Sequence, residues 1–79
     1  MNWFTRLLGC ERRARTNELR VWQWRVDHAE TAEELYDIAE AAIHAGVIDE
    51  VQAMMDRKVI PPHEAIALGL YRGYWEDVA

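Results

Sequence analysis

Histidine and cysteine are the residues of this chain best suited to metal binding, but their spacing is unfavourable. The candidates are His28, His44, His63 and Cys10. Protein metal sites use pairs of ligands a few residues apart, so that two donors reach one ion from a single turn or helix. No two of the four candidates are spaced in this way. We therefore expect no metal site and no cofactor.

Nucleophilic catalysis also lacks its usual residues. The chain contains no serine, and Cys10 is its single cysteine. A catalytic hydroxyl or thiol lies on a sharp turn beside a general base, and no strand–turn–helix pattern surrounds Cys10. The four glycines are isolated instead of forming a loop that could bind phosphate. We therefore expect a protein that is not an enzyme.

Carboxylates at helical spacing are the remaining candidates for chemistry. Glu33, Asp37 and Glu40, followed by His44, recur on the solvent face of the most clearly predicted helix. Paired carboxylates act as acid and base only where a cleft desolvates them. On an outer helix face we expect a solvated acidic ridge. The functional alternative is a patch that complements a basic partner surface.

Large aromatic residues are the strongest functional indication. The chain has four tryptophans, three tyrosines and one phenylalanine among 79 residues. A domain of this size has little interior, so some rings should be exposed, and exposed Trp and Tyr often anchor protein interfaces. The predicted partner-binding surface consists of Trp24, Tyr71, Tyr74 and Trp75, flanked by Glu33, Asp37 and Glu40.

The helix predicted over 32–45 carries the clearest local signals. Thr31 and Glu34 have the spacing of a capping box, in which each side chain accepts a hydrogen bond from the backbone N–H of the other residue. Apolar residues then recur at helical spacing. Gly46 supplies a left-handed stop, and Val47 closes the apolar contact beyond it.

Two more helices are predicted in the second half of the chain. The first covers about 48–58, with acidic residues in its first turn and basic residues in its last. Pro61 and Pro62 then break the chain, and Pro62 suits the first position of the next helix.

An apolar row and two small residues characterise this last helix. Ile66, Leu70 and Tyr74 recur at intervals of four. Gly69 and Gly73 form a small groove on another side of the helix. This groove allows close packing against helix 32–45 or self-association with a second copy.

The first third of the chain has two interpretations. Residues 17–28 fit a helix capped by Asn17, with Trp22 on the inner stripe and Trp24 outside it. They also fit a strand over 20–27, in which both rings point to one side. A lone strand would have to pair with a second copy, so the helix is preferred. The segment before it fits a short amphipathic helix that ends at Gly9 and contains Trp3, Phe4, Leu7 and Leu8.

Length and composition predict one small all-α domain, a bundle of three to four short helices over residues 1–79. Hydrophobic residues make up 51% of the chain and charged residues 29%, which is typical of a folded protein. Residues 1–15 form an amphipathic, arginine-rich segment, and 17–79 form the helical body. A domain this small buries only about 60% of its unfolded surface, which favours a homodimer.

Charge limits the choice of partner. The net charge of −5 divides into +2 over residues 1–30, where six arginines face four acids, and −7 over residues 31–79, where three bases face ten acids. The acidic body repels phosphate, so nucleic-acid binding is not expected. No apolar run approaches the roughly 20 residues that cross a bilayer, and we expect a cytoplasmic protein.

These patterns predict a small non-enzymatic protein that binds a host or cellular protein. In size, acidity and lack of catalytic residues the chain is similar to small phage-encoded inhibitors of bacterial machinery, including anti-CRISPR and host-takeover proteins. This resemblance implies an inhibitor or modulator. Two alternatives stay open. One is a membrane-surface adaptor that uses the apolar residues Trp3, Phe4, Leu7 and Leu8. The other is a binder of a small planar, nucleotide-like ligand.

Overall fold

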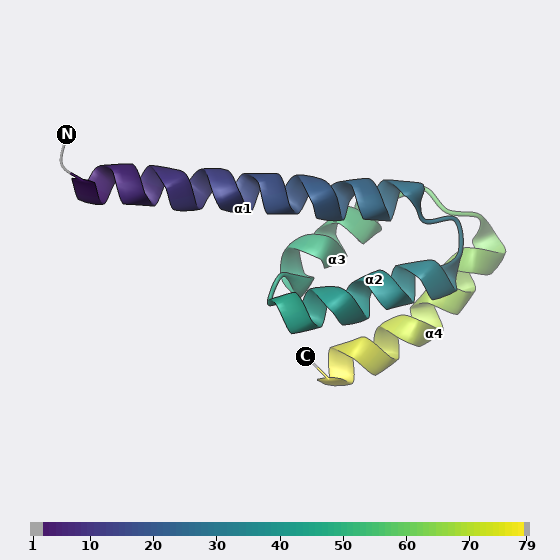
Figure 1. The fold of residues 1–79 in the computed structure, drawn as a ribbon. Helices are drawn as coiled ribbons and strands as arrows, with labels where there is room; N and C mark the ends of the chain where they lie inside the picture. Colours follow the sequence, from purple (N-terminus) through teal and green to yellow (C-terminus); the bar gives the residue numbers. More distant parts are fainter. Residues whose placement is uncertain (1–2, 79) are drawn as a thin grey trace.

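The computed structural model describes the backbone of residues 3–78 and the side chains of residues 15–77. Four helices follow one another along the chain: α1 (Trp3–His28), α2 (Ala32–Ala45), α3 (Ile48–Arg57) and α4 (Pro62–Val78) (Figure 1). No strand occurs between residues 3 and 78. The predicted all-α bundle is confirmed. The strand alternative for residues 20–27 is wrong, because these residues lie in the last turns of α1.

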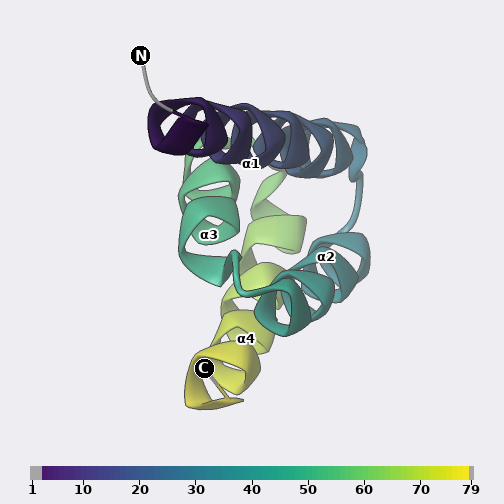
Figure 2. The same ribbon diagram turned by 60° about the vertical axis from the view of Figure 1, so that its left-hand side comes forward.

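The helices form a body with one projecting arm. α1 packs against α2 and α3, and α4 packs against α2. In both ribbon views α1 and α4 lie on opposite sides of the body, and the N-terminal half of α1 extends beyond the other helices (Figures 1 and 2). The molecule is therefore elongated, with principal extents of 53 × 24 × 15 Å.

α1 is one continuous helix, which corrects two predicted boundaries. The helix neither ends at Gly9 nor begins again at Asn17. A single glycine inside a helix costs only about 1 kcal/mol relative to alanine. The sequence Glu-Arg-Arg-Ala-Arg that follows it, residues 11–15, consists of strong helix formers without proline. One glycine is too weak a signal to stop the helix against that propensity.

Several carbonyl groups in the last turn of α1 have hydrogen-bond donors. His28 Nδ1 lies 2.9 Å from the Trp24 carbonyl oxygen, and the Ala29 N–H donates to the Arg25 carbonyl at 3.1 Å. Lys58 Nζ, from the connection between α3 and α4, donates to the carbonyl of Asp27 at 3.0 Å. The last turn of a helix otherwise leaves such carbonyls without partners. The Lys58 bond ties the end of α1 to the connection between α3 and α4.

Both ends of α2 match the prediction. The Glu34 N–H donates to Thr31 Oγ1, and the Glu34 carboxylate accepts from the Thr31 N–H, so the capping box is complete. Gly46 adopts the left-handed conformation with φ 76°, and the Val47 N–H donates to the Ala42 carbonyl at 2.9 Å. Val47 itself is buried. These features are those of a Schellman motif with its apolar contact.

The start of α4 is tied to the start of α2. Pro62 is the first residue of α4, as the sequence predicts. Glu64, in the first turn of α4, accepts a hydrogen bond from the Ala32 N–H at 2.5 Å. An N-terminal helix turn leaves several N–H groups without intrahelical partners, and here a neighbouring helix supplies one acceptor.

The core is small and centres on α2. The buried side chains of α2 that enter it are Leu35, Ala39 and Ala42. The other helices contribute Trp22 and Val26 from α1, Val51, Met54 and Met55 from α3, and Trp75 from α4. Among the described residues no charged or polar side chain is fully buried. The fold is therefore held mainly by apolar packing and by its helix caps.

An ion pair joins α1 to α3 outside this core. Arg15 donates to the Glu50 carboxylate, which also accepts a hydrogen bond from its own backbone N–H. The backbone hydrogen bond is the larger cause, and the Arg15 hydrogen bond the second, of a lowered pKa for Glu50. Both partners are accessible to solvent, so screening limits what the pair adds to stability.

The caps of α2 give a first prediction. Thr31→Ala removes the acceptor of the Glu34 N–H and should lower the free energy of unfolding by about 1 kcal/mol. Gly46→Val should lower it further, because a β-branched residue resists a positive φ. No heavy atom lies within 4 Å of a Cβ built at Gly46, so the cost is conformational. Gly46→Asn is the matched control, since asparagine tolerates this conformation better. Equal urea midpoints for the Val and Asn variants would contradict this account.

The Arg15–Glu50 pair gives a second prediction. The pKa of Glu50 is lowered on folding, so its contribution to stability is present above the usual pKa of a glutamate. That contribution is lost as pH falls through the lowered value. Arg15→Ala should raise the pKa of Glu50 only part of the way, because the backbone hydrogen bond stays. Carboxyl carbon NMR titration of both proteins measures this. A Glu50 pKa at or above the usual value in the parent protein would refute it.

Candidate interaction surfaces

Trp22 and Trp24 lie on opposite sides of α1. Trp22 is 7% exposed and continues the inner stripe of Leu19 and Val26, whereas Trp24 is 61% exposed. The burial predicted for the two rings is thus confirmed. The Arg25 guanidinium lies 4.8 Å from the centre of the Trp22 ring, a cation–π contact at the edge of the core.

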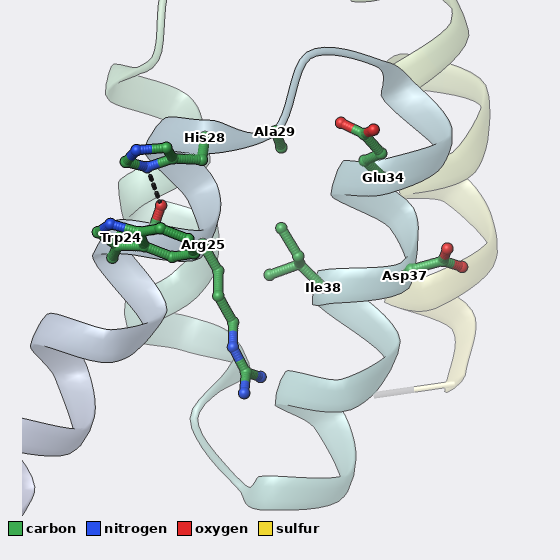
Figure 3. A pocket seen from close by; sticks show the side chains of 7 residues that line it. All are labelled: Trp24, Arg25, His28, Ala29, Glu34, Asp37 and Ile38. Carbon is green, nitrogen blue, oxygen red and sulfur yellow. Dashed lines mark hydrogen bonds between the residues drawn. The ribbon is translucent and has the colours of Figure 1, made fainter.

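The exposed Trp24 ring is held in one orientation. Its ring stacks on His28, one helical turn away, with 4.1 Å between ring centroids and 22° between ring planes. The hydrogen bond from His28 Nδ1 to the Trp24 carbonyl oxygen fixes the imidazole in turn (Figure 3). Val21, one turn earlier, is also exposed. Trp24 is therefore a fixed apolar ring on an accessible surface.

A shallow hollow of about 330 Å³ opens beside this ring, between α1 and α2. Figure 3 shows Ile38 pointing from α2 toward α1, while the carboxylate of Asp37 points away from α1. Glu34 lines the hollow as well, but its carboxylate is engaged by the backbone N–H groups of Glu30 and Thr31. We call the rim and floor of this hollow the Trp24 surface. Its lining residues are Trp24, Arg25, His28, Ala29, Glu34, Asp37 and Ile38.

The predicted acidic ridge runs along α2 and reaches the Trp24 surface through Asp37. Glu33, Asp37 and Glu40 are all exposed. Asp37 belongs to both the ridge and the hollow. The structure therefore brings one predicted acidic residue and one predicted aromatic anchor to the same hollow, although 13 positions separate Trp24 from Asp37 in the chain.

Trp75 corrects the predicted aromatic surface. It is 3% exposed, and its Nε1–H donates to Gln52 Oε1 of α3 at 2.8 Å. Tyr71 is half-buried, with its ring centroid 4.9 Å from that of Tyr36. Both rings face α2 because Tyr36 packs against each of them. Neither is available as the freely exposed anchor that the sequence predicts.

The opposite side of α4 is exposed and uncharged. Ile66, Leu70 and Tyr74 are 71%, 70% and 67% exposed. No neighbouring atom lies within 4 Å of a Cβ built at Gly69 or Gly73, so the predicted packing of this glycine groove on helix 32–45 is wrong. Gly69 and Gly73 lie next to the apolar row on the same exposed side of α4, and not on another side of the helix as predicted. We call this surface the α4 outer face; its exposed residues between 65 and 74 are Ala65, Ile66, Gly69, Leu70, Gly73 and Tyr74.

The other predicted self-association or membrane residues fall outside the described side chains. Trp3, Phe4, Leu7 and Leu8 belong to α1, and only their backbone is described. Within the described part of the chain, no helix is long and apolar enough to span a membrane. Over the same residues, no three histidine, cysteine or acidic side chains gather as metal ligands would.

Comparison of the chain with protein-family models, with curated proteins and with solved structures finds no significant match. Among the side chains of residues 15–77, exposed apolar groups gather on the Trp24 surface of α1 and α2 and on the α4 outer face.

The two neighbouring tryptophans of α1 give a third prediction. Trp22→Ala should destabilise the fold by about 3–5 kcal/mol, because it leaves a cavity in the core. Trp24→Ala should change the free energy of unfolding by no more than about 0.5 kcal/mol, as is usual for an exposed position. Urea denaturation followed by circular dichroism measures both. Similar losses for the two variants would show that the rings are not divided between core and surface.

Proposed function

We propose that this chain is a non-enzymatic binding module that docks on a cellular protein through the Trp24 surface. The observation that carries the proposal is a fixed, exposed tryptophan beside a hollow. Tryptophan is the residue type most enriched among interface positions that contribute most to affinity. The role of inhibitor or modulator fits such a module, because occupying another protein's surface requires no chemistry of its own.

The stacking of Trp24 on His28 supports this use of the ring. A side chain that is free to rotate loses conformational entropy when a partner immobilises it, at about 0.5–1.5 kcal/mol. Trp24 is already restricted by the 4.1 Å stack and by the backbone hydrogen bond of His28. The surface is thus organised before a partner arrives.

The acidic ridge indicates the chemistry of the partner. Glu33, Asp37 and Glu40 lie along α2, and Asp37 lines the hollow. The chain from residue 31 onward carries a net charge of −7. We therefore propose a partner surface with an apolar centre and a basic flank. Electrostatic complementarity of this kind raises the association rate more than the final affinity.

This proposal gives a fourth prediction. Proteins captured from the native cytoplasm by the parent chain are identified, and the purified partner is then titrated with each variant. Trp24→Ala should weaken binding at least about 30-fold, equivalent to the 2 kcal/mol typical of an anchor residue. Asp37→Asn should mainly slow association and reduce its dependence on salt. Val59→Ala is the matched control, since it shortens an exposed apolar side chain that lies outside both candidate surfaces and should bind normally.

The same set of variants separates the alternatives. If Trp24→Ala stays folded and binds the partner with unchanged affinity, the Trp24 surface is not the docking site. Co-sedimentation with anionic vesicles that survives Trp24→Ala would support a membrane-surface adaptor acting through the projecting half of α1. Trp24-dependent fluorescence quenching by a nucleotide would support a planar-ligand binder instead. Either result, without a protein partner, would overturn the proposal.

A further inference from the structure

We infer that the α4 outer face pairs with the same face of a second copy of this chain, with the two α4 helices antiparallel. α4 lies on the side of the body opposite to α1, the helix that carries Trp24 (Figures 1 and 2). The contact does not depend on the proposed function. It would give the molecule two identical Trp24 surfaces, directed outward. Four observations on the described residues carry the inference.

The first observation is the absence of charge over more than two helical turns. All six exposed residues of α4 from Ala65 to Tyr74 are uncharged. The charged residue in that interval, Arg72, is half-buried and bonded to Asp56 and Glu76 at 3.0 and 2.7 Å. By contrast, the exposed side of α2 carries Glu33 and Asp37 among its acids. A continuous apolar surface bounded by polar groups marks an interaction site.

The second observation is that the face is complementary to itself. Ile66, Leu70 and Tyr74 form a raised row along the helix, and Gly69 and Gly73 form a low row next to it. Side-chain rows of one helix fill the grooves of another when two helices pack. Each copy supplies both a raised row and a groove, which is the requirement for a two-fold symmetric contact. The empty space around Gly69 and Gly73 allows the two backbones to approach closely.

The third observation is the distribution of charge at the ends of the face. His63 is exposed at the N-terminal end of α4, where the helix dipole is positive, and Asp77 is exposed at the C-terminal end. Antiparallel pairing places the acidic end of each helix near the N-terminal end of its partner. Parallel pairing would instead bring two acidic ends together. Repulsion between the acidic C-terminal ends and the directions of the helix dipoles therefore favour the antiparallel arrangement.

The fourth observation is that the protein's own core cannot cover this face. α4 buries Trp75 and packs Leu68 and Tyr71 against α2, so its opposite side necessarily points outward. A domain of this size buries a small share of its surface by folding alone. Burying Ile66, Leu70 and Tyr74 in a second copy removes apolar surface that the monomer exposes.

Placing the two-fold axis at Leu70, the middle residue of the raised row, fixes the register of the antiparallel pair. With the axis at Leu70, residue 70 meets its own copy, and Ile66 of one chain lies beside Tyr74 of the other. The two copies of Ile66 are then separated by eight helical positions, about 12 Å along the axis. These relations distinguish antiparallel pairing from every parallel arrangement.

Sedimentation equilibrium of the full chain tests the pairing and gives a fifth prediction. The parent should form a species of twice 9.3 kDa. Leu70→Asp places two charges on the two-fold axis and should raise the dissociation constant at least about 30-fold. Leu70 is exposed in the monomer, so this variant should keep the parent's helical circular dichroism. Val59→Asp, at a position that is 96% exposed but outside the face, is the matched control and should stay dimeric. Trp24→Ala should stay dimeric as well.

Cysteine cross-linking tests the register. In a Cys10→Ala background, Leu70→Cys should form a disulfide-linked dimer under mild oxidation, because residue 70 meets its own copy. Ile66→Cys alone should not, but a mixture of Ile66→Cys and Tyr74→Cys chains should. Equal cross-linking by Leu70→Cys and Ile66→Cys alone would overturn the antiparallel register.

A parent chain that stays monomeric, or a dimer unaffected by Leu70→Asp, would overturn the pairing itself. If such a monomer needs Leu70 to capture another protein, the face belongs to that protein and not to a second copy.

Discussion

The packing of three helices against the small buried side of α2 is the constraint on which the rest of the structure depends. That side consists of Leu35, Ala39 and Ala42, so neighbouring helices approach closely and their large side chains fill the space. Trp22 enters from α1 and Trp75 from α4. The helix caps then determine where α2 begins and ends, and the bond from Glu64 to the first turn of α2 aligns α4 with it.

One consequence of this small centre is that each outer helix is covered on one side only. On α3 the side that faces solvent carries charged residues, among them Asp49, Asp56 and Arg57. For α1 and α4 the one-sided packing leaves Trp24 and the α4 outer face in contact with solvent. An interior built around alanine cannot accept more rings, and the surplus apolar surface is available for partners. The two surfaces differ in kind: one is a fixed ring beside acids, and the other is an uncharged, self-complementary row.

The sequence predicted best those features of the structure that neighbouring residues determine. The capping box at Thr31, the stop at Gly46 and the start at Pro62 act through neighbouring residues, and all three boundaries are confirmed. Trp22 could be assigned to the core and Trp24 to the surface because their helix has one clear apolar stripe. The end predicted at Gly9 failed, since one glycine does not outweigh strong helix formers on its C-terminal side.

The orientation of α4 was not predictable from local signals. Two rows of this helix have apolar helical spacing, one with Ile66 and Leu70 and the other with Tyr71 and Trp75. The choice between them depends on distant residues: Gln52 accepts the Trp75 indole hydrogen bond, and Tyr36 packs on both inward rings.

The central claim, that the other row meets a second copy, is tested most directly by isotope-filtered NMR on a mixture of labelled and unlabelled chains. Within one chain Ile66 and Tyr74 are about 12 Å apart along the helix, too far for an NOE. The account predicts an intermolecular NOE between the Ile66 methyl groups and the Tyr74 ring; its absence at concentrations where the chain is dimeric would contradict the account.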